Sequence, residues 1–257
     1  MKALKIVAIA LLMAGCDSNI DFSGPAPEPP SPDEGKDLLI SEIATFINTD
    51  GAAGGVRNHY VELYNGTANT ADLSKYAIGY QATSDENTLT DWSFTNSANY
   101  VLLTGSLEKG KCYVIASPQA NATAVKRDID WGTTSSANAD ASKPLQLSGN
   151  SGIALLKKDA AGKYTVNGET YSIIDAFGSP NVARVVSGGS NSSRNNFMWT
   201  IAGETKDTRN RTIWRKGTVK DPNPDWATSK GTSAGNSEWM ISGDRAWDYT
   251  NLGLKSN

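Results

Sequence analysis

Short apolar runs separated by Gly, Asn, Asp and Ser make up most of the chain from residue 37 onward. Several runs alternate apolar and polar positions with a period of two, the pattern of a β-strand with one buried face. In the run YVELYN, Val61 and Leu63 point to one side, whereas Tyr60, Glu62 and Tyr64 point to the other. No stretch keeps a 3.6-residue apolar repeat, so the pattern predicts an all-β fold. The predicted strands are 38–43, 60–65, 76–81, 92–94, 100–103, 112–116, 145–147, 152–157 and 172–177.

Three acidic residues and one cysteine fall inside these strand-like runs. Glu42 and Glu62 have apolar neighbours, so each either points to solvent or pairs with a buried Arg or Lys. Asp175 precedes Gly178 closely and is predicted to hold a turn through hydrogen bonds to the backbone. Cys112 is predicted to be a buried free thiol that packs as a small apolar side chain.

The N-terminus has the pattern of a targeting segment. Lys2 and Lys5 precede an apolar stretch at 6–13, too short to span a hydrocarbon layer of ~30 Å. The run LLMAGC then resembles a bacterial lipoprotein signal with its lipobox, although the lipobox prefers Leu where this chain has Met13. The resemblance implies cleavage before Cys16, lipidation of its thiol and an anchor in the cell envelope, at the outer membrane or cell surface. The alternative is an ordinary secretory signal.

A proline-rich segment follows the cysteine. Five prolines lie between residues 25 and 32, with acidic and small residues around them. This composition offers little apolar surface to bury, so the segment is predicted to be a disordered tether. The predicted organisation is a signal peptide at 1–15, a lipidated Cys and linker at 16–36, and one β-domain at 37–257.

Five segments of the body occur in an order that resembles the lamin tail domain family, in its bacterial secreted form. They are LLISEI (38–43), HYVELYNGTANTADLSKYAIGY (59–80), LEKGKCYVIAS (107–117), LQLSGNSGIALLKKD (145–159) and IIDAFG (173–178). The resemblance implies an immunoglobulin-like β-sandwich with long loops, including an insert at 118–143. With no catalytic set of residues found, the resemblance also implies binding or adhesion. Function carried by such long loops does not transfer with the fold.

Charge and composition exclude several classes of site. The chain has 27 acidic and 24 basic side chains and a net charge of -3, which argues against general nucleic-acid binding. One histidine, His59, and two cysteines are too few for a His/Cys metal cage or a multi-disulfide scaffold. No metal or cofactor is therefore expected. One basic group around Trp214, formed by Arg209, Arg211, Arg215 and Lys216, is the alternative phosphate-binding surface.

Two pairs of residues are the candidate ligand contacts. Asp128 and Asp130 in KRDIDWG would lie on one face of a strand, but an acid pair alone is weak evidence for a glycosidase. Trp131 and Trp226 have Asp- and Pro-rich neighbours and are predicted to be exposed, where their rings could stack on sugars. His59 has no nucleophile-elbow serine to activate and is not predicted to be catalytic.

These observations predict a lipid-anchored envelope protein, not an enzyme, whose domain binds or adheres to a protein partner. The alternative is a glycan-binding accessory module that uses Trp131, Trp226, Asp128 and Asp130. A third hypothesis, a hydrolase or nuclease-associated domain, would depend on Asp128, Asp130 or His59. The expected partners are the membrane, through Cys16, and an envelope protein or glycan, with no nucleic acid.

Overall fold

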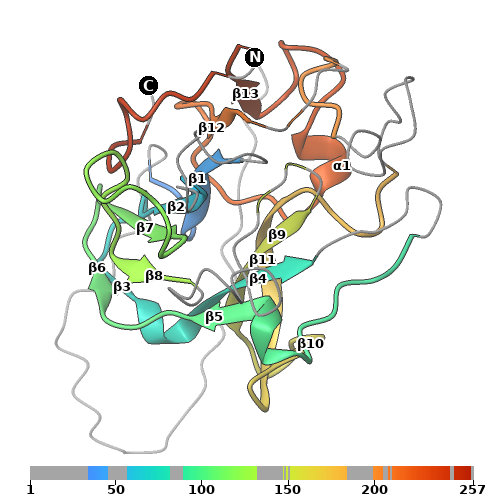
Figure 1. Ribbon diagram of the computed structural model, residues 1–257. Helices are drawn as coiled ribbons and strands as arrows, with labels where there is room; N and C mark the ends of the chain where they lie inside the picture. The colour runs from blue at the N-terminus through green and yellow to red at the C-terminus, as the bar shows by residue number, and fades with distance from the viewer. Residues whose placement is uncertain are drawn as a thin grey trace, which may run out of the picture.

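The computed structural model describes residues 34–45, 57–81, 89–131, 147, 149, 151–183, 199–204, 208, 210–243 and 246–255. The predicted signal peptide, Cys16 and most of the predicted linker lie outside these residues, as does part of the 118–143 insert. Within the described ranges, no helix has the length and apolar character needed to cross a membrane. Two β-sheets dominate the architecture (Figure 1).

The larger sheet has six strands in the order β13-β12-β1-β2-β7-β8. All neighbours are antiparallel except β7 and β8, which run parallel. On the adjacent strands β1 and β2, Glu42 stands directly opposite Glu62. The strands are β1 (Leu39–Ala44), β2 (Tyr60–Tyr64), β7 (Cys112–Ala116), β8 (Ile129–Asp130), β12 (Thr212–Arg215) and β13 (Trp239–Ile241).

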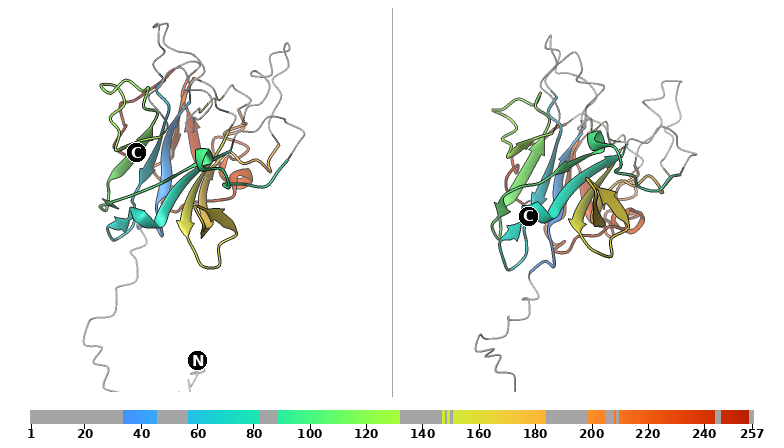
Figure 2. Two further views of the ribbon diagram at one scale, coloured as in Figure 1. Left: turned by 60° about the horizontal axis from the view of Figure 1, so that its bottom comes forward. Right: turned by 90° about the horizontal axis from the view of Figure 1, so that it is seen from below.

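The second sheet has five antiparallel strands in the order β10-β11-β9-β4-β5. Figure 2 shows it facing the six-stranded sheet. Its strands are β4 (Tyr76–Gln81), β5 (Tyr100–Leu102), β9 (Gly152–Lys158), β10 (Tyr164–Val166) and β11 (Glu169–Phe177). The smaller elements are the pair β3 (Ala71–Asp72) and β6 (Ser106–Leu107), the 3-10 turns η1 (Leu73–Lys75) and η2 (Ser97–Asn99), and the helix α1 (Trp226–Ser229).

The main core lies between the two sheets, so the predicted all-β sandwich is confirmed. Val61 and Leu63 of β2 are fully buried in this core, where Ile78 and Leu155 meet them from the other sheet. Tyr60 belongs to a separate cluster on the opposite face of its sheet. The period-two pattern of β2 therefore assigned its faces correctly.

Both outer faces of the sandwich are also covered, by segments that are not strands of the two sheets. Trp92 and Phe94 pack over Ala154 and Leu156 on the outer face of the five-stranded sheet. On the six-stranded sheet, a second cluster contains Tyr60 and packs against residues of the segment 246–255. Polar positions of the period-two pattern therefore do not all reach solvent.

Most predicted strands are present within a residue or two of their predicted bounds, and β4 and β7 match them at both ends. The prediction of a strand at 92–94 is wrong. This segment crosses a sheet face instead of pairing at an edge, and the Ser93 N–H donates to Gln81 Oε1 at 2.8 Å. Leu147, the described residue of the predicted strand 145–147, belongs to no strand. The short strands β3, β6, β8, β10, β12 and β13 were not predicted.

Asp175 connects the two sheets, and its predicted bonding to the backbone is confirmed. The carboxylate accepts N–H groups from Ile40 (2.7 Å), Asn223 (2.9 Å) and Ala176 (3.0 Å). It also forms a fully buried ion pair with Arg215 of β12. A second guanidinium nitrogen, Nη1, forms an ion pair with Glu238 at 2.6 Å. One buried network thus joins β1, β11 and β12.

The prediction that Glu42 and Glu62 point to solvent or pair with an Arg or Lys is wrong. They are 1% and 0% exposed, and no described Lys or Arg forms an ion pair with either. Glu42 accepts a hydrogen bond from the Tyr60 hydroxyl. Glu62 accepts bonds from Ser41 Oγ and from the Gly253 N–H, each at 2.6 Å. The segment 246–255 covers this outer face of the six-stranded sheet, so the two carboxyl groups are buried there. Cys112 is a free thiol in a strand, as predicted, but it is only half-buried.

Candidate functional site

The prediction that Trp131 and Trp226 are exposed is wrong. They are 3% and 1% exposed and belong to the main core. The Trp226 ring packs edge-to-face against Phe177 and Trp199, with centroids 4.9 and 5.7 Å apart. Its neighbour Asp225 suggested exposure, but the role of this polar residue is to cap the N-terminus of α1. Neither ring is available as a stacking platform for a sugar.

Asp128 and Asp130 line a shallow surface pocket of about 440 Å³. β8 begins at Ile129, so only Asp130 lies in the strand. Each carboxylate already has a local partner. Asp128 Oδ2 accepts the Val114 N–H at 2.7 Å, and Asp130 pairs with Arg127. The walls all come from the segment 122–130, so a ligand would not be enclosed from a second side.

His59 is 2% exposed. Its Nδ1 accepts the Leu147 N–H at 2.9 Å. Burial, helped by nearby Arg57, lowers the pKa of His59 to about 3. The imidazole is therefore neutral at ordinary pH and is bonded to the backbone, which fits a structural role.

The predicted phosphate-binding group does not form a surface. Arg211 and Arg215 are 2% and 0% exposed. Arg211 donates to the Ser242 carbonyl oxygen, and Arg215 lies over the Trp239 ring with its Cζ atom 4.2 Å from the centroid. Lys216 donates to the Ala234 carbonyl oxygen at 2.5 Å. Arg209 lies outside the described residues.

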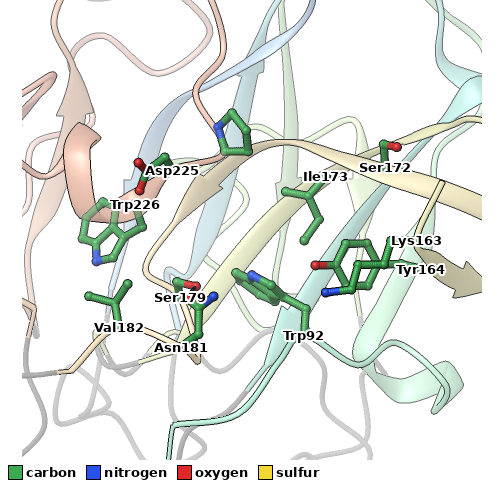
Figure 3. A pocket seen from close by; sticks show the side chains of 11 residues that line it. Trp92, Lys163, Tyr164, Ser172, Ile173, Ser179, Asn181, Val182, Asp225 and Trp226 are labelled. Atoms are coloured by element: carbon green, nitrogen blue, oxygen red, sulfur yellow. Dashed lines mark hydrogen bonds between the residues drawn. The ribbon is translucent and has the colours of Figure 1, made fainter. Parts of the chain in front are cut away.

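A different pocket is the better candidate, and we name it the Trp92 pocket. Its volume is about 340 Å³, at the small end of the range for ligand pockets. Figure 3 shows the Trp92 ring between Tyr164 and Lys163 on one side and Asp225 and Trp226 on the other. The lining residues are Trp92, Lys163, Tyr164, Ser172, Ile173, Ser179, Asn181, Val182, Pro224, Asp225 and Trp226.

Local contacts hold Trp92 in place. Its ring stacks on Phe94, with centroids 5.7 Å apart and planes at 23°. Its backbone N–H donates to the side chain of Asp91 at 2.9 Å. Below the ring lies Gly152, where an added Cβ would be 2.6 Å from the indole. A glycine is therefore needed at this position of β9 for the ring to lie on the sheet.

One wall is the turn and strand that lead into the β10–β11 hairpin. Lys163 forms an ion pair with Asp91, and its ammonium lies 5.4 Å from the centre of the Tyr164 ring. The hydrogen bond from Lys163 lowers the pKa of Asp91. Tyr164 is half-buried, so part of its aromatic surface remains open to a ligand.

The facing wall comes from two turns that follow β11 and precede α1. Ser179 Oγ donates to Asn181 Oδ1 at 2.6 Å, and Asn181 is exposed. Asp225 accepts the N–H groups of Ala227 and Thr228. The pocket thus combines aromatic surface with hydroxyl, amide, carboxylate and ammonium groups.

The serine hydroxyls of this lining already have hydrogen-bond partners. Ser172 donates to a carboxylate, and Ser179 donates to an amide oxygen. His59 does not line this pocket. Within the ranges that the structure describes, no three His, Cys, Asp or Glu side chains are grouped to hold a metal.

Sequence reasoning missed this pocket. It treated Trp92 as a strand residue and took Trp226 as exposed, whereas Trp226 is a buried residue that lines one side of the pocket. Lys163 and Tyr164 precede the β10–β11 turn, which has two positive-φ residues, Asn167 and Gly168. That turn signal could have marked a hairpin, but it does not say which face the hairpin covers.

Comparison with known proteins adds no function. No family model and no curated protein match the chain. Among solved structures, a DUF4876 family protein from Bacteroides thetaiotaomicron is similar over 86% of this chain and 72% of its own, with 13% identity and a TM-score of 0.42. This likeness is too distant to carry an argument. The lamin tail resemblance stays a prediction.

Proposed function

We propose that the chain is a non-catalytic, lipid-anchored binding protein of the cell envelope whose ligand is a carbohydrate held in the Trp92 pocket. The observation that carries this proposal is the lining of the pocket, in which Trp92 and Tyr164 lie beside Lys163, Asn181 and Asp225. Ligand sites commonly combine an aromatic surface with a few polar groups that set orientation.

A sugar suits this lining because its ring has an apolar C–H face and a rim of hydroxyl groups. The half-buried Tyr164 ring offers a surface for the apolar face. Asn181 and Lys163 are exposed beside it and provide polar partners for hydroxyl groups. A purely apolar ligand would form no hydrogen bonds with these polar groups and would displace water from them, at a free-energy cost.

The carbohydrate test uses the full chain with Cys16→Ser, which keeps the protein off the membrane. Binding is screened on an array of neutral and acidic oligosaccharides, and positive glycans are titrated by calorimetry. Tyr164→Ala should weaken binding about tenfold, equivalent to about 1.4 kcal/mol, and Asn181→Ala should weaken it as well. Lys126→Ala, in the pocket at 122–130, is the matched control and should bind normally.

Two results would overturn the carbohydrate proposal. One is a wild-type chain that retains no glycan on the array. The other is equal affinity in wild type, Tyr164→Ala and Asn181→Ala. Recognition of a protein partner stays a prediction, and crosslinking of intact cells followed by pulldown tests it with Cys16→Ala as the control.

Anchoring is tested separately, because the lipobox resemblance supports it and the fold does not bear on it. Cells expressing the full chain are labelled with a palmitate analogue, and the protein is isolated. The wild-type protein should carry the label and sediment with membranes, whereas Cys16→Ala should lose both properties. Unlabelled wild-type protein would favour the alternative of an ordinary secretory signal.

A further inference from the structure

The segment 246–255, which we name the C-terminal strap, lies across the outer face of the six-stranded sheet (red in Figure 1). Its aromatic and apolar side chains, Tyr249 and Leu252, pack on the cluster that contains Tyr60. Further contacts are the bond from Trp247 Nε1 to the Thr45 carbonyl oxygen (2.9 Å), the bond from the Asp248 N–H to Thr212 Oγ1 (2.9 Å), and the Tyr249 ring against the Tyr60 ring (6.0 Å).

Beneath the strap lie the two buried glutamates. The strap contacts Glu62 directly, because the Gly253 N–H donates to Glu62 Oε2 at 2.6 Å. Glu42 stands opposite Glu62 in the sheet register. Its Oε1 accepts the Tyr60 hydroxyl, whereas its buried Oε2 has no hydrogen-bond partner. A buried carboxyl with one unsatisfied oxygen is costly to ionise.

The groups that face Glu42 do not supply a positive charge. Glu62 and Tyr60 face it from β2, and Asp248 faces it from the strap. Cys112 of β7 is also close enough to interact. On β12, its register neighbour is Trp214, a neutral side chain. Asp128 lies near Glu62 and adds a further negative charge.

A lysine fastens the far end of the strap. Lys255 Nζ donates to the carbonyl oxygens of Gly217 (3.4 Å) and Val219. It also lies 5.1 Å from the centre of the Tyr64 ring on β2. The charged groups around it are Lys220 and Arg215, and the Cys112 thiol is the other titratable group nearby.

We propose that the C-terminal strap is a pH-sensitive cover of this face, which opens as Glu42 loses its proton and closes again as Lys255 loses its own. Opening admits water to the carboxyl pair and breaks the Gly253 bond. The proposal rests on the geometry of the strap and is independent of carbohydrate binding.

The pH dependence of strap opening follows from the difference in pKa between the closed and open states. Burial raises the pKa of Glu42 to about 8 from 4.5, so opening releases a proton between these values. The opening constant then rises with pH, by at most about tenfold per unit. Burial lowers the pKa of Lys255 to about 8 from 10.5, so above pH 8 opening takes up a proton and becomes less favourable. The strap should therefore open most readily near pH 8.

Hydrogen exchange measured by mass spectrometry between pH 5 and 10 tests the proposal on the full chain with Cys16→Ser. Exchange rates are corrected for the intrinsic effect of pH, and peptides from β4 (Tyr76–Gln81) serve as the internal reference. Protection of 246–255 should fall from pH 5 to 8 and recover above pH 8, while β4 stays protected throughout.

Two variants separate the two titrations. Glu42→Gln, neutral at every pH, should abolish the fall below pH 8 and keep the rise in protection above it. Lys255→Met should keep the fall and abolish the recovery. Glu169→Gln, an exposed residue paired with Lys158, is the control and should match wild type. Constant strap protection in wild type from pH 5 to 8 would overturn the proposal, as would a wild-type profile in Glu42→Gln. If Glu42→Gln does not fold, Lys255→Met with an unchanged recovery overturns it.

Discussion

Replacing Asp175 with Asn should strongly destabilise the fold, although the two side chains have nearly the same shape. The substitution removes the charge that faces Arg215, and both side chains are fully buried. Glu238 remains beside the guanidinium, but it is 26% exposed and binds a different nitrogen. Removing one partner of a buried ion pair costs about 3–5 kcal/mol, because the other charge stays buried without compensation. The Asn oxygen can replace only one carboxylate oxygen, either Oδ1, which accepts the Asn223 and Ala176 N–H groups, or Oδ2, which accepts the Ile40 N–H. We therefore expect a loss of at least about 3 kcal/mol.

Urea unfolding of the Cys16→Ser chain at pH 7, followed by tryptophan fluorescence, measures this loss. Fluorescence is suitable because the Trp239 ring lies against Arg215. The double variant with Arg215→Met removes both buried charges and should be more stable than the sum of the two single changes predicts. Glu169→Gln, which breaks a surface pair, should cost about 0–1 kcal/mol. If Asp175→Asn costs no more than Glu169→Gln, the reasoning about the uncompensated buried charge is wrong.

Four further changes test other parts of the fold. Gly152→Ala places a Cβ 2.6 Å from the Trp92 ring, so it should cost about 1–3 kcal/mol in urea unfolding and weaken glycan binding in the same titration. Asp225→Ala removes the cap of α1 and should cost about 1 kcal/mol in urea, whereas Asp225→Asn should cost much less. The contribution of His59 to the unfolding free energy should fall by about 5 kcal/mol as the pH falls from 6.5 to about 3, because its folded-state pKa is depressed; the difference between wild type and His59→Gln measures it, since Glu42 acts in the opposite direction above pH 4.5. The contribution of Glu42 should fall by about 5 kcal/mol as the pH rises from 4.5 to about 8, because its folded-state pKa is raised; equal slopes in wild type and Glu42→Gln would contradict this.

The strands were predictable because their signal is local. β4 and β7 are apolar runs bounded by polar or turn residues, and both were predicted to the residue. The alternation in β2 also assigned Val61 and Leu63 to the core. The two-residue strands β3 and β8 could not be found in this way, because two residues carry no periodicity.

The environment of individual side chains was harder to predict, because distant segments create it. Glu62 and Gly253 are 191 positions apart in the sequence, so nothing near Glu62 indicates that a backbone N–H satisfies its carboxylate. The error at Trp226 has a similar origin. Its polar neighbour Asp225 serves the helix N-terminus, and composition alone does not separate a capping residue from an exposed loop.

One physical feature explains both the error at the two glutamates and the position of the two candidate sites. If the outer faces of the sandwich were polar and open to solvent, the Glu42 side chain would lie in water. Trp92 would then have no apolar sheet face to pack on. Here irregular segments cover each outer face, so each face needs its own packing and its own hydrogen bonds. These coverings lack the strand-to-strand bonds of the sheets, and local opening begins where such bonds are few. Under the two proposals, ligand binding beside Tyr164 and proton release at Glu42 would therefore change a covering while the core around Val61 and Leu155 stays packed.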